Sequence, residues 1–316
     1  MTRIILAGIL ILFFGQNTLA ETEITGFVDV LFQGRQKEKT TFGMGTFEID
    51  FTSEFSQKIS FEGAVVIEGE AISLGQTLVD FKLLEKENLS LQVGLIDMPF
   101  GLDYEVFAAP DRKLTTPPLV TELMMDGGWS DIGINFHGSL SIVNYNLYVV
   151  NGMGADENNV PANQLEENNN AKTIGKRLAI SQVKGLEFGF SYAQGPYLPD
   201  NSKETISRTG GYITYNHGPF KIKGEFISGS EEIPGKAKNE HYGYYLQGLC
   251  NISEGIYGAL RYGGWKPKQA EWINRITAGL GYDIIENVSL RIGFQINNET
   301  PEKGNNSISS QVVICF

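Results

Sequence analysis

Histidine and cysteine are scarce in this chain of 316 residues, which has only three of the first and two of the second. The histidines stand far apart, at positions 137, 217 and 241, and no metal-binding spacing or catalytic-triad motif surrounds them. We expect His137 and His217 in short turns and His241 in solvent beside a loop. The sequence therefore predicts no enzyme, no bound metal and no cofactor.

Long apolar runs are missing as well. No stretch of about 18 apolar residues occurs, and the mean hydropathy is -0.13, which excludes a bundle of membrane-spanning helices. The chain is instead rich in glycine and aromatic residues, with 37 Gly, 19 Phe and 13 Tyr. This composition is compatible with a transmembrane barrel, whose strands carry an apolar residue only at every second position.

Basic residues are outnumbered by acidic ones. The 25 Lys and Arg stand against 37 Asp and Glu, which gives a net charge of -12 at pH 7. Proteins that bind nucleic acid carry a basic surface, so we expect no nucleic-acid partner.

Residues 1–20 have the pattern of a secretory signal peptide. Arg3 precedes an apolar stretch from Ile4 to Phe14, and the small residue Ala20 ends the segment before the acidic Glu21. The apolar stretch is too short to span a membrane as a helix. We expect cleavage after Ala20, which leaves residues 21–316 as one domain and makes the mature chain more acidic still.

Apolar and polar residues alternate through nearly the whole remaining chain. In residues 288–296, Val, Leu, Ile, Phe and Ile alternate without a miss against Ser, Arg, Gly and Gln. A period of two residues is typical of β-strands with one apolar face. The same pattern appears around residues 59–67, 79–83, 89–95, 132–136, 143–149, 186–192, 220–226, 256–262, 276–282 and 308–316.

Short turns and longer loops alternate between these segments, as they do in transmembrane barrels. They predict about sixteen antiparallel strands, with both termini at the turn end. The expected turns include His137-Gly138, and the expected loops include residues 69–76, 96–128 and 195–208. Cys250 and Cys315 then lie on strands four apart, about 19 Å of wall, which is too far for a disulfide.

Tyrosine and tryptophan occur where strands are expected to meet loops, which suits a membrane–water interface. These residues are Trp129, Tyr192, Tyr212, Tyr242, Tyr262, Trp265, Trp272 and Tyr282. Ordinary packing of aromatic side chains in a soluble sheet is the alternative.

The alternation also predicts which charged side chains point into the barrel. Arg261, Arg275 and Arg291 fall on the water-facing side of three consecutive strands, with Lys223 before them. The N-terminal half instead points carboxylates inward, namely Glu48, Asp50, Glu62, Glu68, Asp80 and Asp131. We expect the basic residues to line a pore and control its selectivity. The alternative is that they are simply solvated or paired with carboxylates.

The longest loop, residues 96–128, is expected to fold into the barrel and narrow it. Its apolar content favours packing over disorder, and we expect Gly101 and Pro117-Pro118 to turn it inward. Its acidic residues would face the arginines across the constriction, namely Asp97, Asp103, Glu105, Asp111, Glu122 and Asp126. An external lid or a surface segment is the alternative.

Three segments share a pattern with a known family. They are Val93 to Gly101, followed by Pro117 and Pro118, then Trp129 to Gly138, and Tyr148 to Gly152. These segments resemble the phosphate-selective porins of Gram-negative outer membranes. The resemblance implies a sixteen-stranded barrel, often trimeric, with an inward third loop and passive diffusion of solutes. The family's dense basic lining is not matched by this acidic chain. The final Phe316 resembles the signal that the barrel-assembly machinery recognises.

The sequence thus predicts a transmembrane β-barrel that lies in outer-membrane lipid. It would act as a passive porin for small hydrophilic solutes or ions. The rival hypothesis is an occluded barrel whose outer loops, around residues 151–171 and 195–208, bind a partner or surface ligand. A soluble β-protein is a third alternative.

Overall fold

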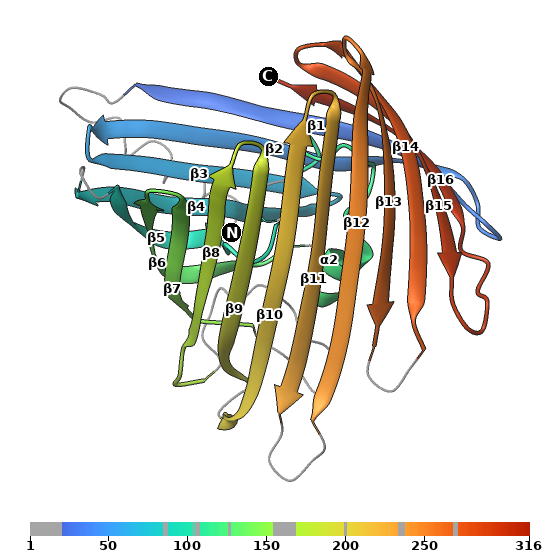
Figure 1. Ribbon diagram of the computed structural model, residues 1–316. Helices are drawn as coiled ribbons and strands as arrows, with labels where there is room; N and C mark the ends of the chain where they lie inside the picture. Colours follow the sequence, from blue (N-terminus) through green and yellow to red (C-terminus); the bar gives the residue numbers. More distant parts are fainter. Residues whose placement is uncertain are drawn as a thin grey trace.

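The computed structural model describes residues 21–84, 88–102, 104, 108–125, 128–153, 169–198, 201–232, 238–267 and 271–316. The predicted signal peptide, residues 1–20, lies outside them. The strands form one closed antiparallel barrel of sixteen, in which each strand pairs with its neighbours in sequence and β1 pairs with β16 (Figure 1). The predicted fold class and strand number are therefore confirmed.

The strands of the first half are β1 (Thr22–Arg35), β2 (Thr41–Ser56), β3 (Ile59–Glu68), β4 (Ala71–Leu84), β5 (Leu89–Asp97), β6 (Ser130–Leu140), β7 (Val143–Val150) and β8 (Thr173–Val183). Those of the second half are β9 (Leu186–Leu198), β10 (Asn201–His217), β11 (Phe220–Glu232), β12 (Asn239–Ser253), β13 (Ile256–Lys266), β14 (Ile273–Ile285), β15 (Val288–Asn298) and β16 (Ser307–Cys315). A short helix, α2 (Leu119–Met124), lies between β5 and β6. Among the described residues no helix is long and apolar enough to cross a membrane.

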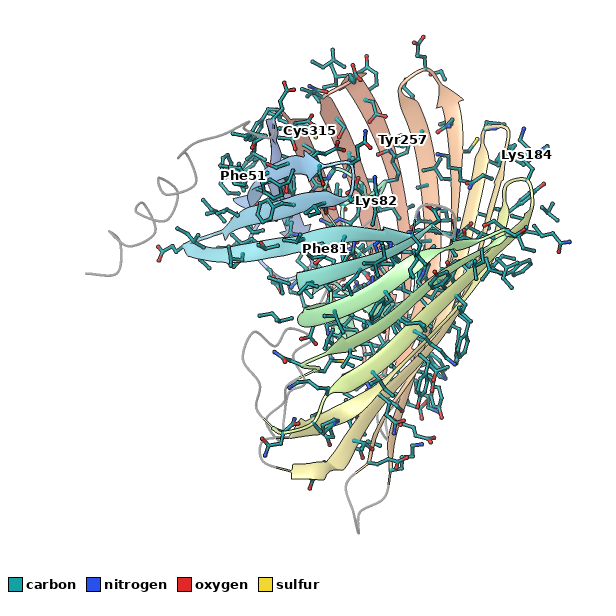
Figure 2. All side chains as sticks on the ribbon, turned by 90° about the vertical axis from the view of Figure 1, so that its left-hand side faces the viewer. Phe51, Phe81, Lys82, Lys184, Tyr257 and Cys315 are labelled. Carbon is teal, nitrogen blue, oxygen red and sulfur yellow. The ribbon has the colours of Figure 1, made fainter. Side chains whose placement is uncertain are left out.

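Side chains alternate between the two faces of the wall, as the sequence predicts. On β15, Ile292, Phe294 and Ile296 are exposed on the outside, whereas Arg291 and Gln295 are buried on the inside. Side chains project from both faces all round the barrel (Figure 2). The outer face is apolar, which suits hydrocarbon, and the inner face is mostly polar.

The barrel is closed by pairing of its first and last strands. β1 and β16 are in register from Phe27 opposite Cys315 to Arg35 opposite Ser307. Gly26 and Phe316 extend this pairing by exchanging two backbone hydrogen bonds of 3.0 Å each. Each of the sixteen described strands is paired on both sides, as an apolar solvent requires. Cys250 and Cys315 are both free thiols.

Three connections differ from the sequence prediction because strands run further than their apolar alternation. β6 continues through Leu140, so the turn is at Ser141-Ile142 rather than His137-Gly138. The second loop is only Gly69-Glu70, since Glu68 already pairs with Ala71. β9 and β10 leave only residues 199–200 between them. Beyond the apolar band, strands can pair through polar residues, which hydropathy does not reveal.

The aromatic residues at strand ends divide between the two faces. Tyr262 and Tyr282 are exposed on the outside, as a membrane interface requires. Trp129, Tyr212 and Trp265 are instead buried inside the barrel, so the interfacial role predicted for these three is wrong. Trp129 and Trp265 belong to an apolar cluster inside the barrel, and the Tyr212 hydroxyl group bonds to Arg177 and Glu187.

An arginine on the outer face tests the inside–outside assignment. Leu260 is 57% exposed on the outer face of β13, and Leu260→Arg should lower the stability of the barrel in lipid vesicles by roughly 2–4 kcal/mol. Thr52→Arg, on the lumen side of β2, is the matched control and should cost much less. Urea titration of the refolded proteins measures both, and equal losses would contradict the assignment.

Candidate functional site

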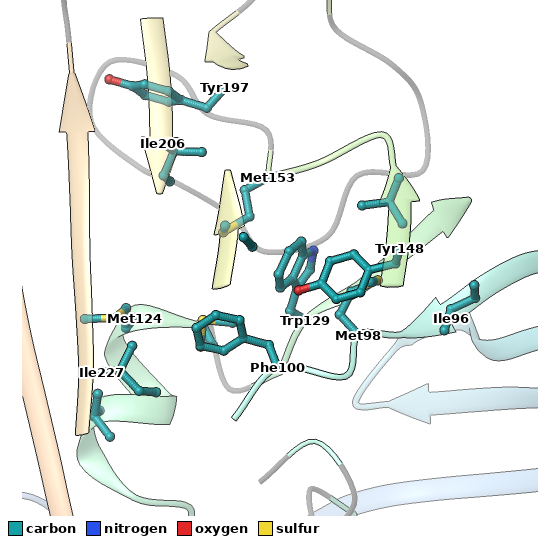
Figure 3. Packing of buried hydrophobic residues seen from close by; sticks show 14 of the residues in the cluster. Ile96, Met98, Phe100, Met124, Trp129, Tyr148, Met153, Tyr197, Ile206 and Ile227 are labelled. Atoms are coloured by element: carbon teal, nitrogen blue, oxygen red, sulfur yellow. The ribbon is translucent and has the colours of Figure 1, made fainter. Parts of the chain in front are cut away.

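The third loop, residues 98–129, folds into the barrel, where α2 packs against β12 and β13 (Figure 1). Its apolar side chains form a cluster with the inner face of the wall (Figure 3). Those from the loop are Met98, Phe100, Leu119, Val120, Met124, Met125 and Trp129, and those they meet include Tyr148, Met153, Ile206, Ile227, Tyr245 and Trp265. Burial of each large side chain stabilises the loop by about 1.5–3 kcal/mol. The inward course predicted from the apolar content of the loop is confirmed.

Gly101 fixes the first bend of the loop. Its φ is +73°, and an added Cβ would lie 2.1 Å from Glu225 Oε1, so both conformation and space require glycine. Gly101 N donates to Ser191 Oγ at 2.9 Å, and Gly101 O accepts from Arg177 Nε at 3.1 Å. Leu102 N donates to Glu225 Oε1 at 3.0 Å. The bend is therefore tied to β8, β9 and β11.

Arg261 on β13 holds the middle of the loop. Its Nη2 donates to the carbonyl oxygens of Thr116 at 2.9 Å and Pro117 at 2.7 Å. Only 4% of Arg261 is exposed. A loop that packs inward takes its carbonyl groups out of water, and the guanidinium replaces the lost hydrogen bonds.

Arg275 and Arg291 complete the row on β14 and β15. Arg291, only 2% exposed, donates to the carbonyl oxygens of Ala109 and, at 3.1 Å, of Pro110. Arg275 Nη1 lies 2.6 Å from Glu122 Oε2 on α2. The three arginines predicted to line the pore thus all contact the third loop. Arg261 and Arg291 are buried by this contact. We call this set of contacts the arginine clamp.

Lys223 faces inward on β11, with Nζ 5.6 Å from the centre of the Tyr245 ring. Together with Lys113 and Lys221 it lines a cavity of about 300 Å³ beside the loop. Lys221 follows the β10–β11 turn closely, so this basic cavity lies toward the turn end of the barrel. It shares Asp111 and Arg112 with a cavity that borders the N-terminal strands.

Acidic residues gather on the opposite side of the loop. Asp97 and Asp111 line a cavity of about 560 Å³ together with Glu48, Asp50, Glu62 and Glu68 from β2 and β3, and Arg112 is the basic residue of its lining. We call it the acidic cavity. Asp97 also accepts a hydrogen bond of 2.6 Å from Ser130 Oγ.

The remaining acidic residues named from the sequence do not join this group. Glu122 lies on α2 and pairs with Arg275. Asp103, Glu105 and Asp126 fall outside the described residues.

A second cavity of about 590 Å³ adjoins the acidic cavity. The two share Gln76, Asp97 and Tyr104 as lining residues. The acidic cavity reaches Glu68 at the loop end of β3, and the second cavity reaches Asn88 and Ser139 near the turn end. Together the two cavities extend along the lumen from the loop end toward the turn end of the barrel.

Asp111 titrates differently from an ordinary aspartate. Burial raises the pKa of its carboxyl group, while Arg291, Lys113 and Arg112 act in the opposite direction. A raised pKa means that the folded chain binds this proton more tightly than the unfolded chain. The charge of Asp111 therefore weakens the fold at neutral pH, and this effect disappears as the pH falls through the folded pKa.

Sequence reasoning missed several buried polar residues. Arg177 touches the loop at Gly101 and lies 4.9 Å from the centre of the Tyr104 ring. Arg208 and Glu231 form a buried ion pair of 3.0 Å between β10 and β11. Their inward positions on the strand alternation are the signal that could have found them, because Arg177 shares its face of β8 with the buried Thr173 and Ala179.

The histidines also lie elsewhere than expected. His137 is inside β6 with Nε2 2.8 Å from Asp80 Oδ2, and His217 ends β10 and stacks on Tyr215. His241 is on β12, mostly buried, with Nε2 2.9 Å from Glu231 Oε1, so the prediction of a solvated loop histidine is wrong. Within the described parts of the chain, no three His, Cys, Asp or Glu side chains are placed to hold a metal ion.

Comparison with known proteins supports the fold. The anion-selective porin from Comamonas acidovorans has a TM-score of 0.73 at 12% identity, covering 94% of this chain and 100% of that one. OmpF of Salmonella typhi, solved with daunomycin, has a TM-score of 0.71 at 11% identity, covering 94% and 98%. The outer membrane channel DcaP of Acinetobacter baumannii has a TM-score of 0.68 at 10% identity, covering 96% and 99%. The chain has the porin fold.

Sequence comparison is less specific. No family model matches the chain. An uncharacterized protein of Aquifex aeolicus (strain VF5) is 28% identical over 174 residues, which are 46% of this chain and 39% of that protein. The match thus spans well under half of the relative. Membership of the phosphate-selective family stays a prediction.

Removing the arginine clamp should loosen the third loop. Each guanidinium–carbonyl hydrogen bond is worth about 1.5–3 kcal/mol, so the double variant Arg261→Ala, Arg291→Ala should lose several kcal/mol and expose residues 108–118 to protease. Arg35→Ala removes an exposed ion pair with Glu38 and should cost less than about 1 kcal/mol. Urea unfolding and limited proteolysis measure the effects. A double variant as protected as the Arg35→Ala control would refute the clamp.

The raised pKa of Asp111 predicts a pH-dependent gain from its removal. Asp111→Asn should unfold at a higher urea concentration than the parent at pH 7, and the difference should shrink as the pH is lowered. The sign follows because acid neutralises the parent Asp111 but leaves the amide unchanged. A difference that grows in acid would show that Asp111 is a stabilising ion-pair partner instead.

Proposed function

We propose that the chain is an outer-membrane porin that passes small hydrophilic solutes and ions, with cations preferred over anions. The route is the pair of cavities between the third loop and the N-terminal strands. An apolar outer face and a closed hydrogen-bonded wall suit insertion in lipid. The short turns would then lie on the periplasmic side and the third loop would enter from outside.

The observation that carries the cation preference is the lining of the acidic cavity. Six carboxylates line it together with one basic residue, Arg112, whereas Arg261 and Arg291 are covered by the loop they hold. The carboxylates are those of Glu48, Asp50, Glu62, Glu68, Asp97 and Asp111. Charges of one sign in a narrow passage with low-dielectric walls concentrate counter-ions. Of the arginine row, only Arg275 keeps more than a few per cent of its side chain exposed, and it pairs with Glu122.

The porin fold leaves the sign of selectivity open. The Comamonas protein is described as anion-selective, yet it shares only 12% of its residues with this chain. Selectivity resides in the inward side chains rather than in the barrel. We therefore infer the preference of this chain from its own lining, and we do not extend the phosphate specificity of the resembled family to it.

Assembly belongs to the same proposal. A terminal strand that ends in Phe316 and pairs with β1 suits recognition by the barrel-assembly machinery. A homotrimer is proposed from the resemblance, and a solved OmpT of Vibrio cholerae is described as a trimer form. The outward residues of a barrel serve lipid and subunit contacts alike, so the wall is suited to both.

Ion preference in a planar bilayer tests the proposal. Under a salt gradient the refolded protein should give open steps and a reversal potential of cation-selective sign. Glu48→Gln with Asp50→Asn should lower the cation-to-anion permeability ratio by about two- to fivefold, because negative charge is removed from the lining.

The matched control removes two charges from exposed loops. Glu38→Gln with Glu302→Gln should leave the ratio almost unchanged, since salt screens exposed charges within about 8–10 Å. Anion preference of the parent would overturn the role of the acidic cavity. Silence from folded, heat-modifiable protein would overturn the porin itself and favour an occluded barrel with binding loops.

A further inference from the structure

The second cavity has a different chemistry from the acidic one. Its wall on β5, β6 and β7 is built from uncharged amide side chains, which we call the amide wall: Gln92, Asn135, Asn144 and Asn146. Ser90 and Ser139 add hydroxyl groups. Four carboxamides on three adjacent strands offer both donors and acceptors and carry no net charge.

The amide wall is ordered by its own hydrogen bonds. Asn135, which is 2% exposed, donates through Nδ2 to Gln92 Oε1 at 2.9 Å and to Asn146 Oδ1 at 3.0 Å. Asn135 Oδ1 is buried and accepts no hydrogen bond from the described residues. The side chains of Gln92 and Asn146 are thus held through their amide oxygens. Within the described residues, no hydrogen bond occupies Gln92 Nε2 or Asn146 Nδ2.

The charged groups around this cavity are already paired. Arg177 Nη2 lies 3.8 Å from Glu187 Oε1, and His137 Nε2 lies 2.8 Å from Asp80 Oδ2. Glu187 also accepts hydrogen bonds from Ser181 and Tyr212, each of 2.8 Å. Apart from Asp97, which borders both cavities, the second cavity thus offers an ion little unpaired charge.

Oriented amides are suited to hydroxyl groups. A carboxamide can donate to one hydroxyl and accept from the next, so a row of them matches a solute with several neighbouring hydroxyl groups. A cavity of about 590 Å³ falls within the range of small-molecule sites. The ring of Tyr104, shared with the acidic cavity, adds an aromatic side chain to the lining, and Arg177 lies 4.9 Å from its centre.

We propose that the amide wall is a binding site for an uncharged polyhydroxylated solute of mono- or disaccharide size on its way through the pore. The proposal rests on the proposed porin function and adds a substrate class to it. Binding occurs in series with the acidic cavity, after the shared boundary at Gln76, Asp97 and Tyr104. A bound solute fills the route and lowers the ion current while it stays.

Sucrose is the probe for the test. Single-channel conductance should fall saturably as sucrose is added, and by more than with a polyethylene glycol of matched hydrodynamic radius, which lacks the row of hydroxyl groups. The isosteric pair Gln92→Met, Asn146→Leu keeps the shape of the wall but removes two amides. It should raise the half-blocking sucrose concentration by about three- to tenfold.

Two further variants keep the test decisive. Asn144→Ala, at an exposed position of β7, should weaken the block in the same direction if the double variant does not fold. The control pair Glu38→Gln, Glu302→Gln should keep the block of the parent. Equal effects of sucrose and the polymer, or an unchanged block in the folded amide variants, would overturn the site. If the parent conducts ions but sucrose does not block it, only the sugar-binding site is contradicted. If the parent does not conduct, the porin function itself is contradicted.

Discussion

Guanidinium groups bonded to carbonyl oxygens of the third loop determine which part of this barrel is open. A barrel of sixteen strands has room for an aqueous lumen, and a loop that enters it loses water from its backbone. Arg177, Arg261 and Arg291 restore those hydrogen bonds, and the apolar cluster around Trp129 supplies the rest of the packing. These anchors lie on β8 and β13–β15, while the apolar contacts of α2 lie on β12 and β13. The loop therefore lies on one side of the lumen. The cavities of the proposed route lie chiefly beside the N-terminal strands.

This asymmetry changes how the charge of the lumen is distributed. The arginine row of β13–β15 and the carboxylates of β2 and β3 stand on different parts of the wall, as the strand alternation indicates. Because the loop covers the arginines, their guanidinium groups bind backbone carbonyl oxygens of the loop and the carboxylate of Glu122. The carboxylates of β2 and β3 face no such cover and border the acidic cavity. The arginine row and the carboxylates of β2 and β3 therefore contribute unequally to the field along the proposed route.

The fold could be read from the sequence because strand number, closure and facing depend on a local pattern with a period of two. The alternation around residues 288–296, for instance, fixes Arg291 as inward without knowledge of any partner. The partners themselves were out of reach, because the contact between Arg291 and Ala109 joins positions 182 residues apart. The same limit hid the burial of Trp129. Strand ends were misplaced where polar residues continue the pairing, as in β9 and β10.

The separation of the two faces also explains why such different sequences share one barrel. Lipid contact and wall stability depend on the outward residues and on backbone pairing, both of which tolerate many apolar substitutions. The inward residues are exchanged independently, since every second position can change without altering the outer surface. Identities of 10–12% with TM-scores of 0.68–0.73 are the expected result. The selectivity of this chain therefore has to be derived from its own acidic cavity, arginine clamp and amide wall rather than from its fold. The inward residues therefore determine which solutes and ions the proposed pore passes.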